Sequence, residues 1–178
     1  MGDITSHFFY EGKVVIKRSN DNSSTHSPFV VAVWDADSLP DQERCSSLEA
    51  GFVIELLQRF PFARGRSDIK DEQPHVLTFY VNQSKLLMHS VNQKRVKVID
   101  SAQGSEFQHG IISAGRHDGK PGFLNDRRRV NVAISRFRDQ LIFVCHRRML
   151  QASIFWKTMA SVWSSLDIIV DVGHSRLS

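Results

Sequence analysis

The sequence alternates between short apolar runs and longer segments with helical periodicity, and this alternation limits the fold more than any other feature. The apolar runs are rich in Val, Ile and Phe, which is typical of strands buried on both faces of a sheet. Alternating strands and helices predict an α/β fold, in which helices cover both faces of a mostly parallel sheet. We expect the strands at 29–34, 76–81, 96–99, around 111–112, at 141–145 and, along one edge of the sheet, at 168–172.

The most distinct helix start lies at Ser46-Ser47-Leu48-Glu49, which fits a capping box. In such a box a side-chain oxygen accepts a hydrogen bond from a free backbone N–H of the first turn. The residues after it form an apolar stripe at helical spacing up to Pro61, which ends the helix. We expect further helices over 4–10 and 82–91, from Asn125 or Asp126 to Phe137, and over roughly 147–164, and a short strand at 13–16.

Length and composition exclude several classes of protein. A chain of 178 residues suits a single domain, and 41% hydrophobic with 24% charged residues argues against wholesale disorder. Cys45 and Cys145 lie far apart, and the histidines show no ligand spacing, so we expect a reducing compartment and no metal site. No apolar stretch approaches the ~20 residues that span a bilayer. We therefore expect a cytoplasmic or nuclear protein that does not contact membranes.

The net charge of +4 is unevenly distributed. Residues 116–148 contain nine Lys or Arg against three Asp or Glu, so this segment is basic and the remainder slightly acidic. A basic segment of this kind favours contact with a polyanion. The alternative is a solvated, charged helix, which the run Arg127-Arg128-Arg129 by itself would favour.

Two motifs stand out in the second half of the chain. Residues 99–106 read Ile-Asp-Ser-Ala-Gln-Gly-Ser-Glu and follow an expected strand, and residues 122–138 read Gly-Phe-Leu-Asn-Asp-Arg-Arg-Arg-Val-Asn-Val-Ala-Ile-Ser-Arg-Phe-Arg. The second motif begins at a Pro-Gly turn and continues with helical periodicity. Nucleotide and phosphate sites are built from such parts, namely a strand that ends in a polar glycine turn and a helix that bears arginines.

These motifs resemble those of superfamily 1 helicases, in the branch that includes the nonsense-mediated-decay RNA helicase and senataxin. In that family the second RecA-like domain carries an Asp-x-x-Gln-Gly-x-Glu motif, which Asp100, Gln103, Gly104 and Glu106 match. A Gly-Phe-Leu-x-Asp-x-Arg-Arg-x-Asn-Val-Ala-x-[Ser/Thr]-Arg-x-Arg motif follows, and residues 122–138 match it almost throughout. The resemblance implies that residues 1–178 form a RecA-like domain, the C-terminal motor half of such a helicase.

The phosphate-binding pattern Gly-x-x-x-x-Gly-Lys-[Ser/Thr] does not occur in these 178 residues. The resemblance therefore implies that ATP and Mg²⁺ are held mainly by an N-terminal RecA-like domain, supplied in cis or in trans. Single-stranded RNA or DNA is the other expected partner. By itself, the chain is not expected to hydrolyse ATP.

The resemblance also assigns roles to single residues. Arg136 corresponds to the arginine finger, which neutralises the charge that develops on the γ-phosphate. Glu106 corresponds to the carboxylate that accepts hydrogen bonds from the ribose hydroxyls, and Gly104 allows a close approach of the backbone. The nucleotide-binding candidates are thus Glu106, Gly104, Arg129, Gln83 and Tyr80, and the nucleic-acid-binding candidates are Ser101, Gln103, Thr78 and Arg116.

The chain departs from the family pattern at a few positions. Phe79 stands where the family has proline, and Gly110 and Gly115 stand where it has large strand-forming residues, although glycine weakens a strand. Two alternatives stay open. Arg136 could form a surface salt bridge rather than serve catalysis, and the whole chain could be a truncated, non-catalytic paralogue that binds nucleic acid or protein.

Overall fold

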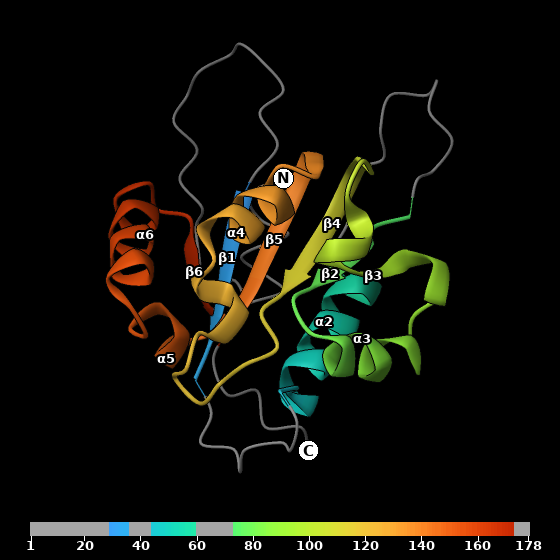
Figure 1. The fold of residues 1–178 in the computed structure, drawn as a ribbon, viewed down its shortest axis with the longest axis horizontal. Helices are drawn as coiled ribbons and strands as arrows, with labels where there is room; N and C mark the ends of the chain where they lie inside the picture. The colour runs from blue at the N-terminus through green and yellow to red at the C-terminus, as the bar shows by residue number, and fades with distance from the viewer. Residues whose placement is uncertain (1–28, 36–43, 60–72, 173–178) are drawn as a thin grey trace.

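The structure is a computed structural model that describes residues 29–35, 44–59 and 73–172 (Figure 1). The helix expected over 4–10 and the strand expected at 13–16 lie outside these ranges. Six strands form one sheet in the order β3-β2-β4-β5-β1-β6, and every strand pairing is parallel. The strands are β1 (Phe29–Trp34), β2 (His75–Thr78), β3 (Val96–Val98), β4 (Phe107–Ser113), β5 (Phe137–His146) and β6 (Ile169–Val172).

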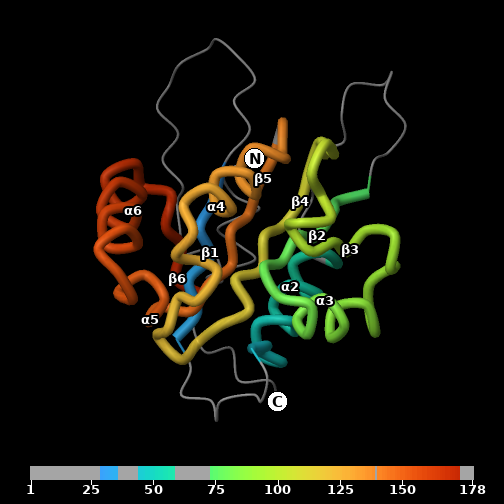
Figure 2. The backbone as a smooth tube through the Cα atoms, in the orientation of Figure 1, coloured from blue at the N-terminus to red at the C-terminus, as the bar shows by residue number. Residues whose placement is uncertain are grey.

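Helices cover both faces of this sheet, as the alternating pattern predicted. Figures 1 and 2 show α4 lying across the front of the sheet, on the face that also carries α6. Helices α2 and α3 pack on the opposite face. The helices are α2 (Ser47–Arg59), α3 (Val81–Met88), α4 (Arg127–Ile134), α5 (Arg147–Leu150) and α6 (Ile154–Ser165), with 3-10 turns η1 (Gln93–Arg95), η2 (Ile99–Ala102) and η3 (Gly122–Asn125).

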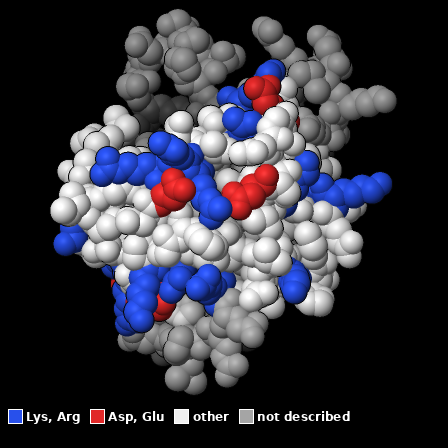
Figure 3. Space-filling model, in the orientation of Figure 1, with Lys and Arg blue, Asp and Glu red and all other residues white. Residues whose placement is uncertain are grey.

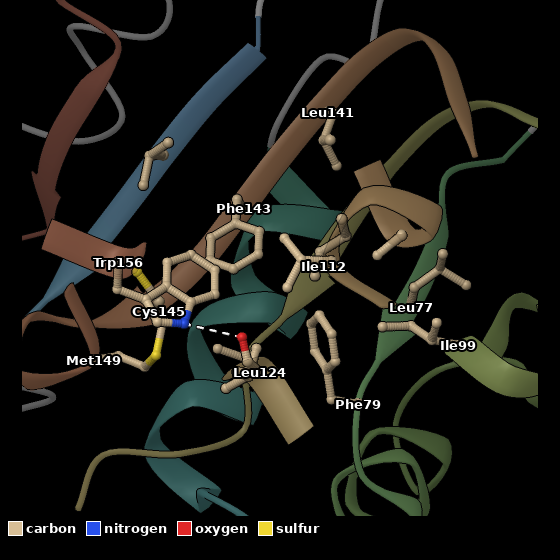
Figure 4. Packing of buried hydrophobic residues seen from close by; sticks show 14 of the residues in the cluster. Leu77, Phe79, Ile99, Ile112, Leu124, Leu141, Phe143, Cys145, Met149 and Trp156 are labelled. Carbon is tan, nitrogen blue, oxygen red and sulfur yellow. Dashed lines mark hydrogen bonds between the residues drawn. The ribbon is translucent and has the colours of Figure 1, made fainter. Parts of the chain in front are cut away.

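Strand β5 shows why the apolar runs are continuous rather than alternating. Phe143 belongs to the core on the α4 face, whereas its neighbours Ile142 and Val144 belong to the core on the α2 face. On the α4 face the Phe143 ring packs near Trp156 of α6 (Figure 4). The indole N–H of Trp156 donates to the Leu124 carbonyl oxygen at 3.0 Å, and this bond ties α6 to the turn before α4.

Three of the predicted elements have clearly different bounds in the structure, and in the first two a specific contact explains the difference. The helix expected to reach Phe137 ends at Ile134, because Phe137 pairs with Phe107 and opens β5. The helix expected over 147–164 is broken, because the Ser153 hydroxyl accepts a hydrogen bond from the Trp156 N–H and starts a new helix. The strand expected over 76–81 ends at Thr78, so the helix that follows is shifted and occupies Val81–Met88.

Other local signals are confirmed. Asp126, rather than Asn125, caps α4, since its carboxylate accepts from the N–H groups of Arg128 at 2.9 Å and Arg129 at 3.4 Å. Strand β6 lies at the edge of the sheet, as the sequence predicted. The Asp126 carboxylate also interacts favourably with the positive end of the α4 dipole.

Gly110 in β4 is required by its neighbours. A Cβ atom at this position would overlap the carbonyl oxygen of His75 in β2 and the ring of Phe137 in β5. Glycine at this position, although it departs from the family pattern, leaves the space that the Phe137 ring occupies. We expect Gly110→Ala to lower the free energy of unfolding by about 1–3 kcal/mol, as overpacking does, in urea denaturation.

The matched control is Gly51→Ala in α2, where a Cβ atom would meet nothing within 4 Å. Alanine there is expected to stabilise the helix by roughly 0.5–1 kcal/mol. If Gly110→Ala were as stable as the parent, Gly110 would not be packed as described.

Candidate functional site

The two motifs singled out in the sequence lie side by side on the α4 face. After β3, residues 99–106 form η2 and a glycine turn and return to the start of β4, while α4 runs beside them. A guanidinium nitrogen of Arg129 lies 3.1 Å from a carboxylate oxygen of Asp100. Arg136 donates to the Ser105 carbonyl oxygen at 3.3 Å, and Arg138 forms an ion pair with Glu106. Three arginines of the second motif thus contact the first motif.

Arg136 lies in the turn between α4 and β5 rather than on the helix. Besides the bond to Ser105, its Nε donates to the Val132 carbonyl oxygen at 3.1 Å and its Nη2 to the Ser135 hydroxyl at 3.3 Å. Its own carbonyl oxygen accepts from the N–H of Phe107 at 2.8 Å. Because a guanidinium carries five N–H donors, these contacts fix its plane and leave donors for an anionic oxygen.

Glu106 and Gly104 flank Ser105, whose carbonyl oxygen accepts a hydrogen bond from Arg136. The side chains of Glu106 and Arg138 are 53% and 62% exposed, so their ion pair is worth at most about 1 kcal/mol and a ligand can compete for either partner. Gly104 has a φ of +78°, and a Cβ atom there would meet nothing within 4 Å. Glycine is therefore required for its backbone conformation, and the space beside this turn is open.

Tyr80 follows the C-terminal end of β2, and Arg116 follows that of β4. Glu106 and Gly104, by contrast, precede the start of β4. The Tyr80 hydroxyl donates to the Pro121 carbonyl oxygen at 3.2 Å and accepts from the Phe123 N–H at 3.1 Å, so it holds the turn that leads into η3. Arg116 forms an ion pair with Asp118 and lies over the Tyr80 ring. The candidate nucleotide and nucleic-acid residues are thus divided between the two ends of the strands, with Arg129 between them.

Thr78 and Gln83 have no exposed surface. The Gln83 amide accepts from the Ser46 N–H at 2.7 Å and donates to the Ser113 hydroxyl at 3.1 Å, and the Thr78 hydroxyl accepts from the Tyr80 N–H at 3.4 Å. Buried polar groups with such hydrogen-bond partners contribute to the stability of the fold. Because both side chains are fully buried, we leave them out of the proposed site, and their ligand contacts stay predictions. Ser101, Gln103, Gly104 and Glu106 remain on the surface of the molecule.

Sequence reasoning missed the role of Glu49. The Ser46 hydroxyl accepts from the Glu49 N–H at 3.2 Å, as the capping box predicts, but the Glu49 carboxylate points into the protein. It accepts from the Trp34 indole N–H at 3.0 Å, the Ser113 hydroxyl at 2.6 Å and the Gly115 N–H at 2.7 Å. Burial raises the pKa of Glu49 to about 7, although these hydrogen bonds act in the opposite direction. The sequence signal that could have indicated this role is Trp34, whose indole N–H needs an acceptor when the side chain is buried.

Within the described ranges, no group of three or more His, Cys, Asp or Glu side chains is placed to hold a metal ion. Among the helices that the structure describes, none is both long and apolar enough to cross a membrane.

Comparisons with known proteins agree with the two motifs. A family model described as "AAA domain" matches residues 1–148. The regulator of nonsense transcripts 1 homolog of Drosophila melanogaster is 28% identical over 142 residues, which are 72% of this chain and 12% of that protein. DNA-binding protein SMUBP-2 of Mesocricetus auratus is 32% identical over 95 residues, which are 50% of this chain and 10% of that protein.

A third relative is the putative ATP-dependent RNA helicase ECM32 of Saccharomyces cerevisiae. It is 33% identical over 86 residues, which are 47% of this chain and 8% of that protein. The chain thus matches about a tenth of the length of each of these relatives. Since the family match covers most of the chain and the parallel α/β sheet is of the RecA-like type, the chain belongs to the AAA domain family and is a superfamily 1 helicase domain of the branch that contains regulator of nonsense transcripts 1.

Proposed function

We propose that this chain is the second motor domain of an ATP-dependent helicase that acts on single-stranded RNA or DNA. The observation that carries the proposal is the contact between the two motifs through Asp100–Arg129, Ser105–Arg136 and Glu106–Arg138. A motor must transmit the state of its nucleotide to its nucleic-acid track, and two packed motifs on one face supply a short physical connection.

On the nucleotide side, Arg136 is the proposed arginine finger. A guanidinium that is already held by Val132, Ser105 and Ser135 needs little reorganisation when negative charge develops on a phosphoryl group. Glu106 would exchange Arg138 for the ribose hydroxyls, while the open turn at Gly104 admits the nucleotide. The described ranges hold no cluster of three or more candidate metal ligands, and the sequence has no P-loop pattern, so we assign the metal and the triphosphate to a partner P-loop domain.

On the nucleic-acid side, the proposed contacts are Ser101, Gln103 and Arg116. Figure 3 shows Lys and Arg side chains gathered on the face that carries α4. Phosphates that bind to such a face release counterions, which gives an affinity that falls as salt is added. The name of one relative includes "DNA-binding" and that of another "RNA helicase", so both polymers are suitable probes.

We expect the 178-residue chain to bind a labelled single-stranded oligonucleotide no more tightly than roughly micromolar at physiological salt. Fluorescence anisotropy across a salt series measures both the affinity and its salt dependence. Lys120→Ala, in the basic segment, should reduce the slope of log affinity against log salt by roughly 0.7. Lys85→Ala removes the same charge from α3, on the opposite face of the sheet, and should leave the slope unchanged.

The alternative, a non-catalytic binding module, has one observation in its favour. Two of the arginines, Arg116 and Arg138, are already paired with Asp118 and Glu106. In a module that has lost its motor function, such pairs would be permanent rather than exchanged for ligands. No binding even at low salt would favour a protein-binding module, whereas binding without any role for Arg136 in hydrolysis would favour a nucleic-acid-binding one.

A further inference from the structure

Phe123, in η3, is a large apolar side chain with 44% of its surface exposed. Its neighbour Leu124 is fully buried, so the short turn fills the core with one side chain and presents the other to solvent. A single exposed apolar residue is ordinary in proteins. What distinguishes Phe123 is the set of groups that surround it.

The orientation of Phe123 is fixed from below by Tyr80. The two rings are stacked, with centroids 5.5 Å apart and planes at 22°. The Tyr80 hydroxyl also accepts the Phe123 N–H at 3.1 Å, so one residue holds both the ring and the backbone of Phe123. Gly122 permits this approach, because its φ is +52° and a Cβ atom there would lie 2.6 Å from the Tyr80 hydroxyl oxygen. The exposed ring is therefore pre-positioned.

Cations surround this pair of rings. The guanidinium carbon of Arg129 lies 4.7 Å from the Phe123 centroid and that of Arg44 lies 5.8 Å from it. Arg116 lies 5.8 Å from the centroid of Tyr80. Arginine planes stack on both aromatic side chains and nucleobases, and their charge attracts phosphates. Exposed aromatic rings beside cations are the combination with which proteins bind single-stranded nucleic acid.

We infer that Phe123 is a stacking platform for one base of single-stranded nucleic acid. The guanidinium groups of Arg129 and Arg44, which lie over its ring, give way to the base and contact the flanking phosphates. The inference rests on the proposed function and adds to it a contact that recognises bases as well as phosphates. Three guanidinium groups around the two rings favour a polyanion over an apolar protein partner. Arg129 also pairs with Asp100, so the platform adjoins the first motif.

The test compares two oligonucleotides of equal length, one with bases and one with abasic residues, by anisotropy with the 178-residue chain at low salt. Phe123→Ala should weaken binding to the base-containing strand by roughly five- to hundredfold, the range of stacking on one aromatic side chain. It should leave the affinity for the abasic strand unchanged, because phosphate contacts do not depend on the ring. Phe123→Trp should preserve the preference for bases.

Two controls separate stacking from other effects. Ile154→Ala removes a different large apolar side chain, 83% exposed on α6, and should change neither affinity. Phe123→Leu keeps apolar volume but removes the aromatic face, so it should lose the preference for bases as Phe123→Ala does. This variant tests the inference even if Phe123→Ala folds poorly.

The outcomes distinguish the inference from the proposed function. If the parent chain binds neither strand, the proposed nucleic-acid function fails, and the stacking platform fails with it. If the parent binds strands but Phe123→Ala and Phe123→Leu bind the base-containing strand as tightly as the parent, only the platform is overturned. Equal losses on both strands would show that Phe123 acts through the placement of Arg129, which also overturns it.

Discussion

Arg136→Ala should lower the rate of ATP turnover by about 10³–10⁵-fold in a helicase that pairs this chain with its P-loop domain. This is the range that an arginine finger contributes to turnover. The guanidinium is held by the backbone oxygens of Val132 in α4 and Ser105 in the turn before β4, so as an arginine finger it would stabilise charge with little reorganisation. The loss should fall on kcat rather than on KM, because the interaction is strongest in the transition state. Initial rates at saturating ATP and oligonucleotide, with Mg²⁺ present, measure the effect.

Arg128→Ala is the control, since Arg128 is exposed on α4 and its loss removes the same charge. It should change turnover little, and both variants should melt near the temperature of the parent. Arg136→Lys keeps the charge but loses the planar donor fork, so it should remain severely impaired. The 178-residue chain by itself should show no hydrolysis above background. Equal losses from Arg136→Ala and Arg128→Ala, or ATPase activity of the isolated chain that Arg136→Ala abolishes, would remove the assignment.

Ionisation of Glu49 should lower the free energy of unfolding by about 3 kcal/mol as the pH rises from 4.5 to beyond 7. The sign follows from the pKa, which burial raises to about 7 in the folded protein from an ordinary value of 4.5. Between these values the folded state holds a proton that the unfolded state has released, so stability falls with rising pH. Below pH 4.5 both states are protonated and the full contribution is present. Above about 7 both are ionised and it is lost.

Glu49→Gln isolates this contribution from those of other groups. Glutamine does not titrate, so the stability of the variant relative to the parent should rise by about 3 kcal/mol across this pH range. Ser113→Ala provides a second check. It removes the hydroxyl that donates to the Glu49 carboxylate at 2.6 Å, so the pKa of Glu49 should rise further and the fall in stability should move to higher pH. Parallel pH profiles for the parent and Glu49→Gln, from urea titrations, would contradict the buried, titrating carboxylate.

Much of the fold is encoded in neighbouring residues. The run 29–34 in β1 and the run 141–145 in β5 are apolar at every position because both faces of each strand are buried, and this predicted a parallel sheet covered on two sides. The cap at Asp126 was readable because capping depends on residues within one turn. The two motifs were recognisable as well, since they consist of particular residue types at fixed spacing in the sequence.

Contacts between distant residues were decided only by the tertiary structure. Phe137 is compatible with the apolar face of a helix and with a strand, and its pairing with Phe107 selects the strand. Glu49 fits a capping box locally, yet its carboxylate binds Ser113 and Gly115, more than sixty residues away. Gln83 was predicted to contact the nucleotide, and only the tertiary structure shows that its amide lies in the interior, bonded to Ser46 and Ser113. The physical reason is the same in each case: periodicity and capping depend on local chain geometry, whereas burial and hydrogen-bond partners depend on which segments the sheet brings together.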